Sequence, residues 1–184
     1  MAGIGDTVFA MTEWIRTTPM VDFALWLSTK EICEWVQSHS FMVPVLQMIH
    51  IFAIAMGFGS VVLFNLRLVG RGGADTTVTQ SAHRYLPWMK WSLVILFLSG
   101  VGMVLGDPVR LLVNPVFWIK ITLFVVAMIV SIVHLKTISR KTKTSPTWDA
   151  TTSGSIAIRS SAYGLIILWL LIMAGGRFMA YAPM

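Results

Sequence analysis

Four long apolar stretches alternate with short polar segments along this chain, and their lengths lead to the first prediction. A helix needs about 20 mainly apolar residues to cross the hydrocarbon core of a bilayer. Each stretch is close to that length and is bounded by proline, glycine or charged residues. The pattern therefore predicts four membrane-spanning helices, at about residues 41–66, 88–105, 115–135 and 155–180.

Residues 1–40 follow a different pattern, in which charged residues interrupt the apolar ones every few positions. Their longest uncharged run, 23–29, is too short to cross a membrane. Short helices with tryptophan and phenylalanine on one face are typical of segments that lie in the membrane interface. We expect such helices here, serving either as an anchor or as a lid over a site. A further short interfacial helix is expected over 77–85, ended or kinked by Pro87.

The predicted fold class follows from these two patterns. It is an all-α integral membrane protein, with an interfacial amphipathic helical segment over 1–40 and a four-helix transmembrane domain over 41–184. Composition agrees, since 56% of the 184 residues are hydrophobic and only 12% are charged, against about 25% charged in soluble domains. The single cysteine, Cys33, excludes an internal disulfide and a four-cysteine metal site.

The distribution of charge predicts the orientation in the membrane. Basic residues gather in the loops after the first and third predicted spans, and these loops are therefore expected in the cytoplasm. They are Arg67, Arg71, Arg84, Lys90, Lys136, Arg140, Lys141, Lys143 and Arg159. Both termini would then face the outer, periplasmic side of a bacterial inner membrane.

The net charge of +6 is explained by these basic loops, so it does not indicate nucleic-acid binding. The start of the chain lacks the features of a cleaved signal peptide, and none is expected.

His50 is the first candidate for chemistry, because it lies inside the first predicted span. An ionisable side chain is costly in lipid, so such a residue is either functional or hydrogen-bonded to a neighbouring helix. Neutral imidazole is the commonest metal ligand, and histidines are common axial ligands of haem iron. The candidate metal ligands are therefore His50, His134 and His83.

Depth in the membrane limits which histidines can share a metal. At helical rise, His50 lies about 13 Å and His134 about 28 Å from the outer face, an offset of about 15 Å. One haem cannot take both as axial ligands. His83 and His134 both fall at the cytoplasmic boundary, where an imidazole is tolerated without any function and where the two could instead share one haem. His50 would need another partner in the outer half of the bundle. The options there are His39, Met103 and Met173.

Three polar residues near the outer ends of the spans extend the candidate site. Lys120 and Arg177 either reach back to the interface or, with Asn114, hold haem propionates or a quinone head group. Asn114 before Pro115 also predicts the N-cap of the third span. The leading hypothesis is a haem b-binding electron-transfer protein, linked to a quinone pool and to a partner protein or larger membrane complex.

Two other classes of function stay open. The small residues of Gly57-Phe58-Gly59-Ser60 would let another helix approach closely, which suits a cofactor-free accessory or assembly subunit. Twelve methionines and four histidines suit Cu(I), and hence copper handling. The sequence contains no His-Glu-x-x-His, no Cys-x-x-Cys, no phosphate-binding glycine loop and no recognisable Ser-His-Asp arrangement. Hydrolysis and nucleotide chemistry are therefore not expected.

Several spaced motifs form a wider pattern over about residues 41–181. They are His50, Asn65-Leu66-Arg67-Leu68-Val69-Gly70, Leu86-Pro87-Trp88, Asn114-Pro115-x-Phe117-x-x-Lys120, His134, Trp148, Arg159 and the run from Gly176 to Tyr181. This pattern resembles a bacterial family of small four-span inner-membrane proteins of unknown function. The architecture is more distantly similar to cytochrome b561 and copper-resistance D-type membrane proteins. The paired histidines that hold two haems in the b561 manner are not seen here.

Overall fold

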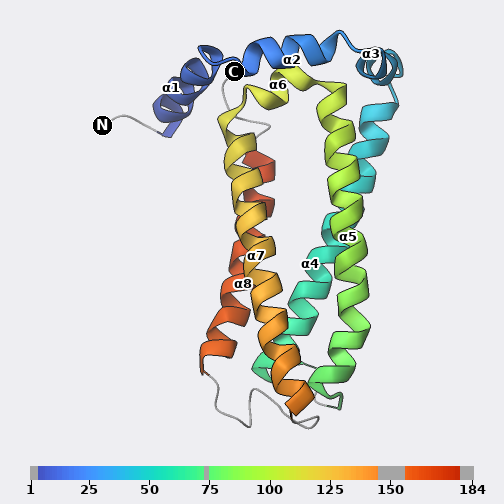
Figure 1. Cartoon of the computed structure of the whole chain (residues 1–184), viewed down its shortest axis with the longest axis vertical. Coiled ribbons are helices and arrows are strands. Elements are labelled where there is room, and N and C mark those ends of the chain that lie inside the picture. Colours follow the sequence, from blue (N-terminus) through green and yellow to red (C-terminus); the bar gives the residue numbers. More distant parts are fainter. Residues whose placement is uncertain (1–3, 73–74, 145–155, 179–184) are drawn as a thin grey trace. The chain divides into compact units, whose positions relative to one another are not determined.

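The computed structural model describes residues 4–72, 75–144 and 156–178. Within these ranges the backbone forms eight helices and no strand (Figure 1). Trp148 and Tyr181 of the sequence motifs lie outside the described residues. The all-α class predicted from the sequence is confirmed.

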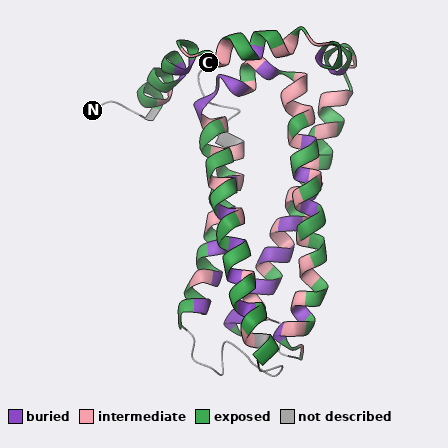
Figure 2. Cartoon of the chain, in the orientation of Figure 1, coloured by how far each residue is buried: buried purple, intermediate pink, exposed green. Residues whose placement is uncertain are grey.

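Four helices are long and apolar enough to cross a membrane: α4 (Met42–Val69), α5 (Val78–Gly106), α7 (Pro115–Thr144) and α8 (Ile156–Phe178). In none of them is more than 33% of the most apolar window buried inside the protein. Large apolar side chains such as Phe52 and Phe97 are about two-thirds exposed, and Figure 2 shows exposed residues along all four helices. Such surfaces are stable against lipid, because helices satisfy their own backbone hydrogen bonds. The chain is a multi-pass membrane protein.

Two helix boundaries differ from the prediction. α5 begins at Val78 and runs through Pro87, so the short helix expected over 77–85 is part of the same helix as the second span. A proline removes one backbone hydrogen bond, but a membrane helix can tolerate this loss where its neighbours and local adjustments compensate. α7 continues past residue 135 to Thr144, with Lys141 and Lys143 in its last turn. Cations at that end are favourable to the helix dipole.

The chain divides into two compact units. The first unit contains Met1–Phe52, Ile95–Thr122 and Ile172–Met184, and the second contains Ala53–Val94 and Leu123–Leu171. Each of the four long helices contributes one part to each unit.

The first unit carries the N-terminal helices α1 (Ile4–Arg16), α2 (Met20–Ser28) and α3 (Glu31–Ser38), and the short helix α6 (Pro108–Leu112). α2 packs against α6, α1 and α3. The aromatic side chains of Trp14, Trp26 and Trp35 are more than half exposed. Their exposure matches a face that lipid would cover, and the interfacial location of this segment stays a prediction.

Glycines bring α4 and α5 close together in both units. In the first unit, a Cβ on Gly102 would lie 2.9 Å from Leu46 Cδ1, and one on Gly106 would lie 2.6 Å from Val43 Cγ2. In the second unit, a Cβ on Gly57 would lie 2.5 Å from Ser92 Oγ. Such distances are shorter than side-chain contacts allow, so alanine at any of these positions would force the neighbouring side chain or helix to shift.

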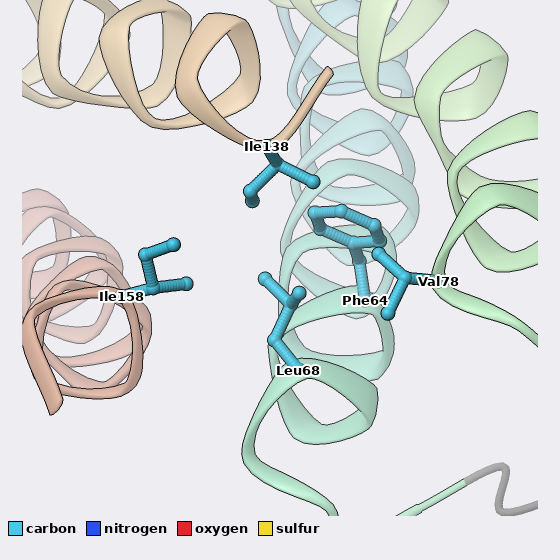
Figure 3. Packing of buried hydrophobic residues seen from close by; sticks show 5 residues of the cluster. All are labelled: Phe64, Leu68, Val78, Ile138 and Ile158. Carbon is cyan, nitrogen blue, oxygen red and sulfur yellow. The ribbon is translucent and has the colours of Figure 1, made fainter. Parts of the chain in front are cut away.

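An apolar cluster forms the core of the second unit and draws on all four of its helices. The buried members shown in Figure 3 are Phe64, Leu68, Val78, Ile138 and Ile158. The loop after α4 turns at Gly70, whose φ of 80° is a conformation that favours glycine. The Arg67 Nε then donates a hydrogen bond to the Thr76 carbonyl oxygen at 2.6 Å, which ties the end of α4 to the start of α5.

Candidate functional site

In the first unit, the half-buried side chain of His50 on α4 faces α5. Its Nδ1 lies 2.8 Å from the Oγ of Ser99. A Cβ on the next residue, Gly100, would lie 3.8 Å from His50 Cε1, so the ring lies beside a residue that has no side chain. The imidazole is therefore held against α5 by one hydrogen bond and one backbone surface.

Ser99 determines which nitrogen of His50 carries the proton. The serine hydroxyl donates its only proton to the Ile95 carbonyl oxygen, 2.6 Å away. It can then only accept a hydrogen bond from His50, so Nδ1 is protonated and Nε2 keeps its lone pair. Metal-bound histidines usually have this arrangement, with one nitrogen bound to the metal and the other donating to a fixed partner.

Lys120 on α7 belongs to the same unit as His50. Its Nζ lies 3.5 Å from the position that a Cβ would take on Gly176 of α8. The ammonium group therefore lies against the bare backbone of α8. A positive charge is thus present in the same unit as the imidazole.

The other residues predicted for the outer half of the site are placed as follows. Asn114 is buried, and its Oδ1 accepts a hydrogen bond from the Val116 backbone N–H at 2.9 Å, which confirms the predicted N-cap of α7. Met103 and Met173 are half-buried in the first unit. Arg177 belongs to α8, and its side chain lies outside the described part of the chain.

His39 is tied to the N-terminal segment. Its Nδ1 lies 2.7 Å from the Trp35 carbonyl oxygen, and its ring packs against the rings of Trp35 and Phe41. Local contacts at the end of α3 therefore account for this histidine.

The second unit contains a similar pair, His134 on α7 and Ser161 on α8. The His134 Nδ1 lies 2.9 Å from Ser161 Oγ, and that hydroxyl donates to the Ile158 carbonyl oxygen, also at 2.9 Å. By the same argument, Nδ1 carries the proton and Nε2 keeps a lone pair. Unlike His50, His134 is almost fully buried, and its Nε2 has no hydrogen-bond partner among the described residues.

A small cavity of about 10 Å³ lies beside His134. Asn65 and Ser131 line it too, and their Oδ1 and Oγ atoms are also buried without a partner among the described residues. A cavity of this volume holds about one water molecule. It is far too small for a porphyrin.

A larger pocket of about 430 Å³ lies elsewhere in the second unit. His83, Lys90 and Lys143 contribute basic groups to its lining, which is otherwise largely apolar. Its volume falls within the usual range for small-molecule sites, about 300–1,000 Å³.

The structure places His83 and His134 at two different cavities, although the sequence allowed them to share one haem. Phe64 and Leu135 line both spaces, but His134 does not line the larger one and His83 does not line the smaller one. His134 is hydrogen-bonded to Ser161 on α8. His83 is exposed on α5 and lines the larger pocket together with Lys143 of α7. A shared haem at this level is therefore not favoured.

Four polar neighbours of these histidines were not predicted: Ser99 and Ser161, which are hydrogen-bonded to them, and Asn65 and Ser131, which line the cavity beside His134. The sequence did not pair Ser99, Asn65, Ser131 or Ser161 with a histidine. A signal was present, because a serine or asparagine inside an apolar helix needs a hydrogen-bond partner. Polar residues at a similar depth in two predicted spans are therefore candidates for a hydrogen bond between those spans.

Within residues 4–72, 75–144 and 156–178, no group of three or more His, Cys, Asp or Glu side chains converges. A metal site made wholly of such residues is therefore not formed in the described part of the chain. An imidazole that binds a metal here would need a second ligand of another type or a ligand supplied by a cofactor.

These features define a class of protein: a multi-pass, all-α membrane protein in which each unit holds one histidine on a serine of a neighbouring helix. Residues 25–182 match DUF6644, a family of unknown function, and the chain belongs to this family. The predicted resemblance to a family of unknown function is thus confirmed. No curated protein and no solved structure matches the chain.

Proposed function

We propose that this protein is a haem b-binding electron-transfer protein of the membrane, in which His50 would hold the haem iron. The observation that supports it best is the hydrogen bond between Ser99 and the His50 imidazole. Its Nδ1 donates to Ser99, which leaves the Nε2 lone pair for iron. Bound haem b would supply one-electron transfer, which no side chain of this chain supplies by itself.

The chemistry of the first unit fits this cofactor. Lys120 provides a cation of the kind that pairs with haem propionates. Gly100 has no side chain, which lets the imidazole lie against the backbone of α5. Met103 and Met173 belong to the same unit, and a thioether is a known second ligand of haem iron. Asn114 uses its Oδ1 for the helix cap, so only its amide N–H groups are left for a propionate or a quinone.

The surroundings of His134 do not fit a haem, and we assign that residue no role in haem binding. The cavity beside its Nε2 measures about 10 Å³, which leaves no room for a porphyrin. This assignment removes one of the three ligands predicted from the sequence. His50 alone then carries the haem proposal.

The pocket at His83 supports the quinone part of the proposal. Its volume of about 430 Å³ and its mainly apolar walls suit a quinone ring. The imidazole of His83 and the ammonium groups of Lys90 and Lys143 would donate hydrogen bonds to the quinone oxygens. The positive-inside rule would place this pocket on the cytoplasmic side, with both termini facing outward from a bacterial inner membrane.

The absorption spectrum of the full-length protein, purified from membranes of haem-replete cells, tests the proposal. We expect a Soret band and stoichiometric iron in the wild type and in His39→Ala, and the loss of both in His50→Ala. His39 is the matched control, since local contacts account for it. A wild-type protein without a Soret band and without iron would refute the proposal. Co-purification of a stoichiometric partner, or of copper, would then favour an accessory subunit or copper handling.

A further inference from the structure

A second polar site lies in the second unit and involves none of the residues assigned above to haem or quinone. Asn65, Ser131 and His134 are 2%, 6% and 6% exposed, and all three line the cavity of about 10 Å³. Each presents one buried polar atom with no hydrogen-bond partner within the described residues. Unpaired polar atoms are costly inside a membrane protein, so three of them around one cavity indicate a bound species.

The hydrogen bonds outside the cavity determine what each of these atoms offers inside it. The Asn65 Nδ2 donates to the Val61 carbonyl oxygen at 2.8 Å, and the opposite amide orientation would bring two oxygens together. Oδ1 is therefore the acceptor that is left for the cavity. His134 offers the lone pair of Nε2, because Nδ1 donates to Ser161. Ser131 offers a hydroxyl that is free to donate. The site thus has two acceptors and one donor.

We infer that this site binds one water molecule. The two hydrogens of water match Asn65 Oδ1 and His134 Nε2, and one of its lone pairs matches the Ser131 hydroxyl. The volume of the cavity agrees, because one water molecule needs a cavity of about 10–15 Å³. The bound water connects α4 with α7, and through His134 and Ser161 it extends the connection to α8. It is a structural element of the second unit.

A metal ion fits the same atoms less well. All three groups are neutral, so they would not compensate the charge of a divalent ion that is removed from water. Water satisfies every atom without bringing a charge into the membrane. The ligand is therefore a small neutral molecule with two donors and one acceptor.

Water-edited solid-state NMR of the full-length protein in lipid bilayers tests the inference, with ¹⁵N-labelled histidine. We expect transfer from a slowly exchanging water to the His134 imidazole, with the proton on Nδ1. In Asn65→Leu and Ser131→Ala this transfer is lost or strongly reduced. His83, which is exposed, serves as the internal reference for rapidly exchanging water.

Two results would overturn the inference. One is the absence of water transfer to His134 in the wild type, which needs no variant to fold. The other is a stoichiometric metal that is lost in His134→Ala and retained in His50→Ala. A density map at high resolution gives an independent check, since the water should lie within about 3 Å of all three atoms. None of these outcomes depends on whether haem binds at His50.

Discussion

The imidazole of His50 on α4 is hydrogen-bonded to the hydroxyl of Ser99 on α5, with 2.8 Å between Nδ1 and Oγ. The bond joins two predicted spans and fixes the protonation of the ring at the same time. His134 and Ser161 repeat the relationship in the second unit. The two histidines differ in their burial: His50 is half-buried, whereas His134 is almost fully buried and lines a water-sized cavity.

Replacing Ser99 with alanine should weaken haem binding while leaving the fold intact. The imidazole loses the acceptor that orients it, and such changes beside a metal ligand typically cost about 10–100-fold in affinity. The measurement is Soret absorbance per protein during haem titration. Ser99→Thr should retain most of the binding, because it keeps the hydroxyl.

Ser92→Ala is the matched control for Ser99→Ala. Ser92 is also buried on α5, but its hydroxyl donates only to the Met89 carbonyl oxygen of its own helix. Equal losses in the two variants would show that Ser99 acts through helix packing instead of through His50.

Replacing Lys120 with methionine should lower the midpoint potential of the bound haem. A nearby cation disfavours the additional positive charge of ferric iron, so its removal stabilises the oxidised form. Lys120→Arg keeps the charge and should keep the potential. Redox titration of the three proteins measures the effect, and an unchanged potential in Lys120→Met would place the haem away from this residue.

Replacing Gly57 with alanine should destabilise the second unit. The new Cβ would lie 2.5 Å from Ser92 Oγ and 3.1 Å from Ser92 Cβ, so the Ser92 side chain must turn away and α5 must shift slightly from α4. Overpacking of this kind typically costs about 1–3 kcal/mol. The measurement is the free energy of unfolding in mixed micelles.

Gly59 provides the control on the same helix. A Cβ there meets nothing within 4 Å among the described atoms, so Gly59→Ala should be neutral or stabilising by about 0.5–1 kcal/mol through helix propensity. If both alanine variants behaved alike, the close approach at Gly57 would not be a determinant of stability.

Cys33 should react slowly with thiol reagents in the native protein. Burial on α3, outside the membrane spans, raises the pKa of its thiol, so less of the reactive thiolate is present at a given pH. Labelling at pH 8 should accelerate after unfolding in SDS. A Cys33→Ser protein that also carries Ser38→Cys, at an exposed position on the same helix, should label rapidly in both states. Fast native labelling of Cys33 would contradict the packing of α3.

Length and composition were sufficient to predict the four spans, because a helix in lipid is selected by local apolar content. The Asn114 cap was also predictable, since it involves residues two positions apart. Even His50 was recognisable as an ionisable group in an apolar run. These features depend on neighbours in the chain, and the sequence contains those directly.

The partners of the histidines depended on the tertiary structure. Ser99 and Ser161 are far from His50 and His134 in the sequence, and only the rotation and packing of the helices bring them together. The same applies to the separation of His83 from His134, which span depth alone could not reveal. Asn65, Ser131 and His134 meet at one cavity because α4 and α7 pack with those faces inward. No spacing along the chain encodes that orientation.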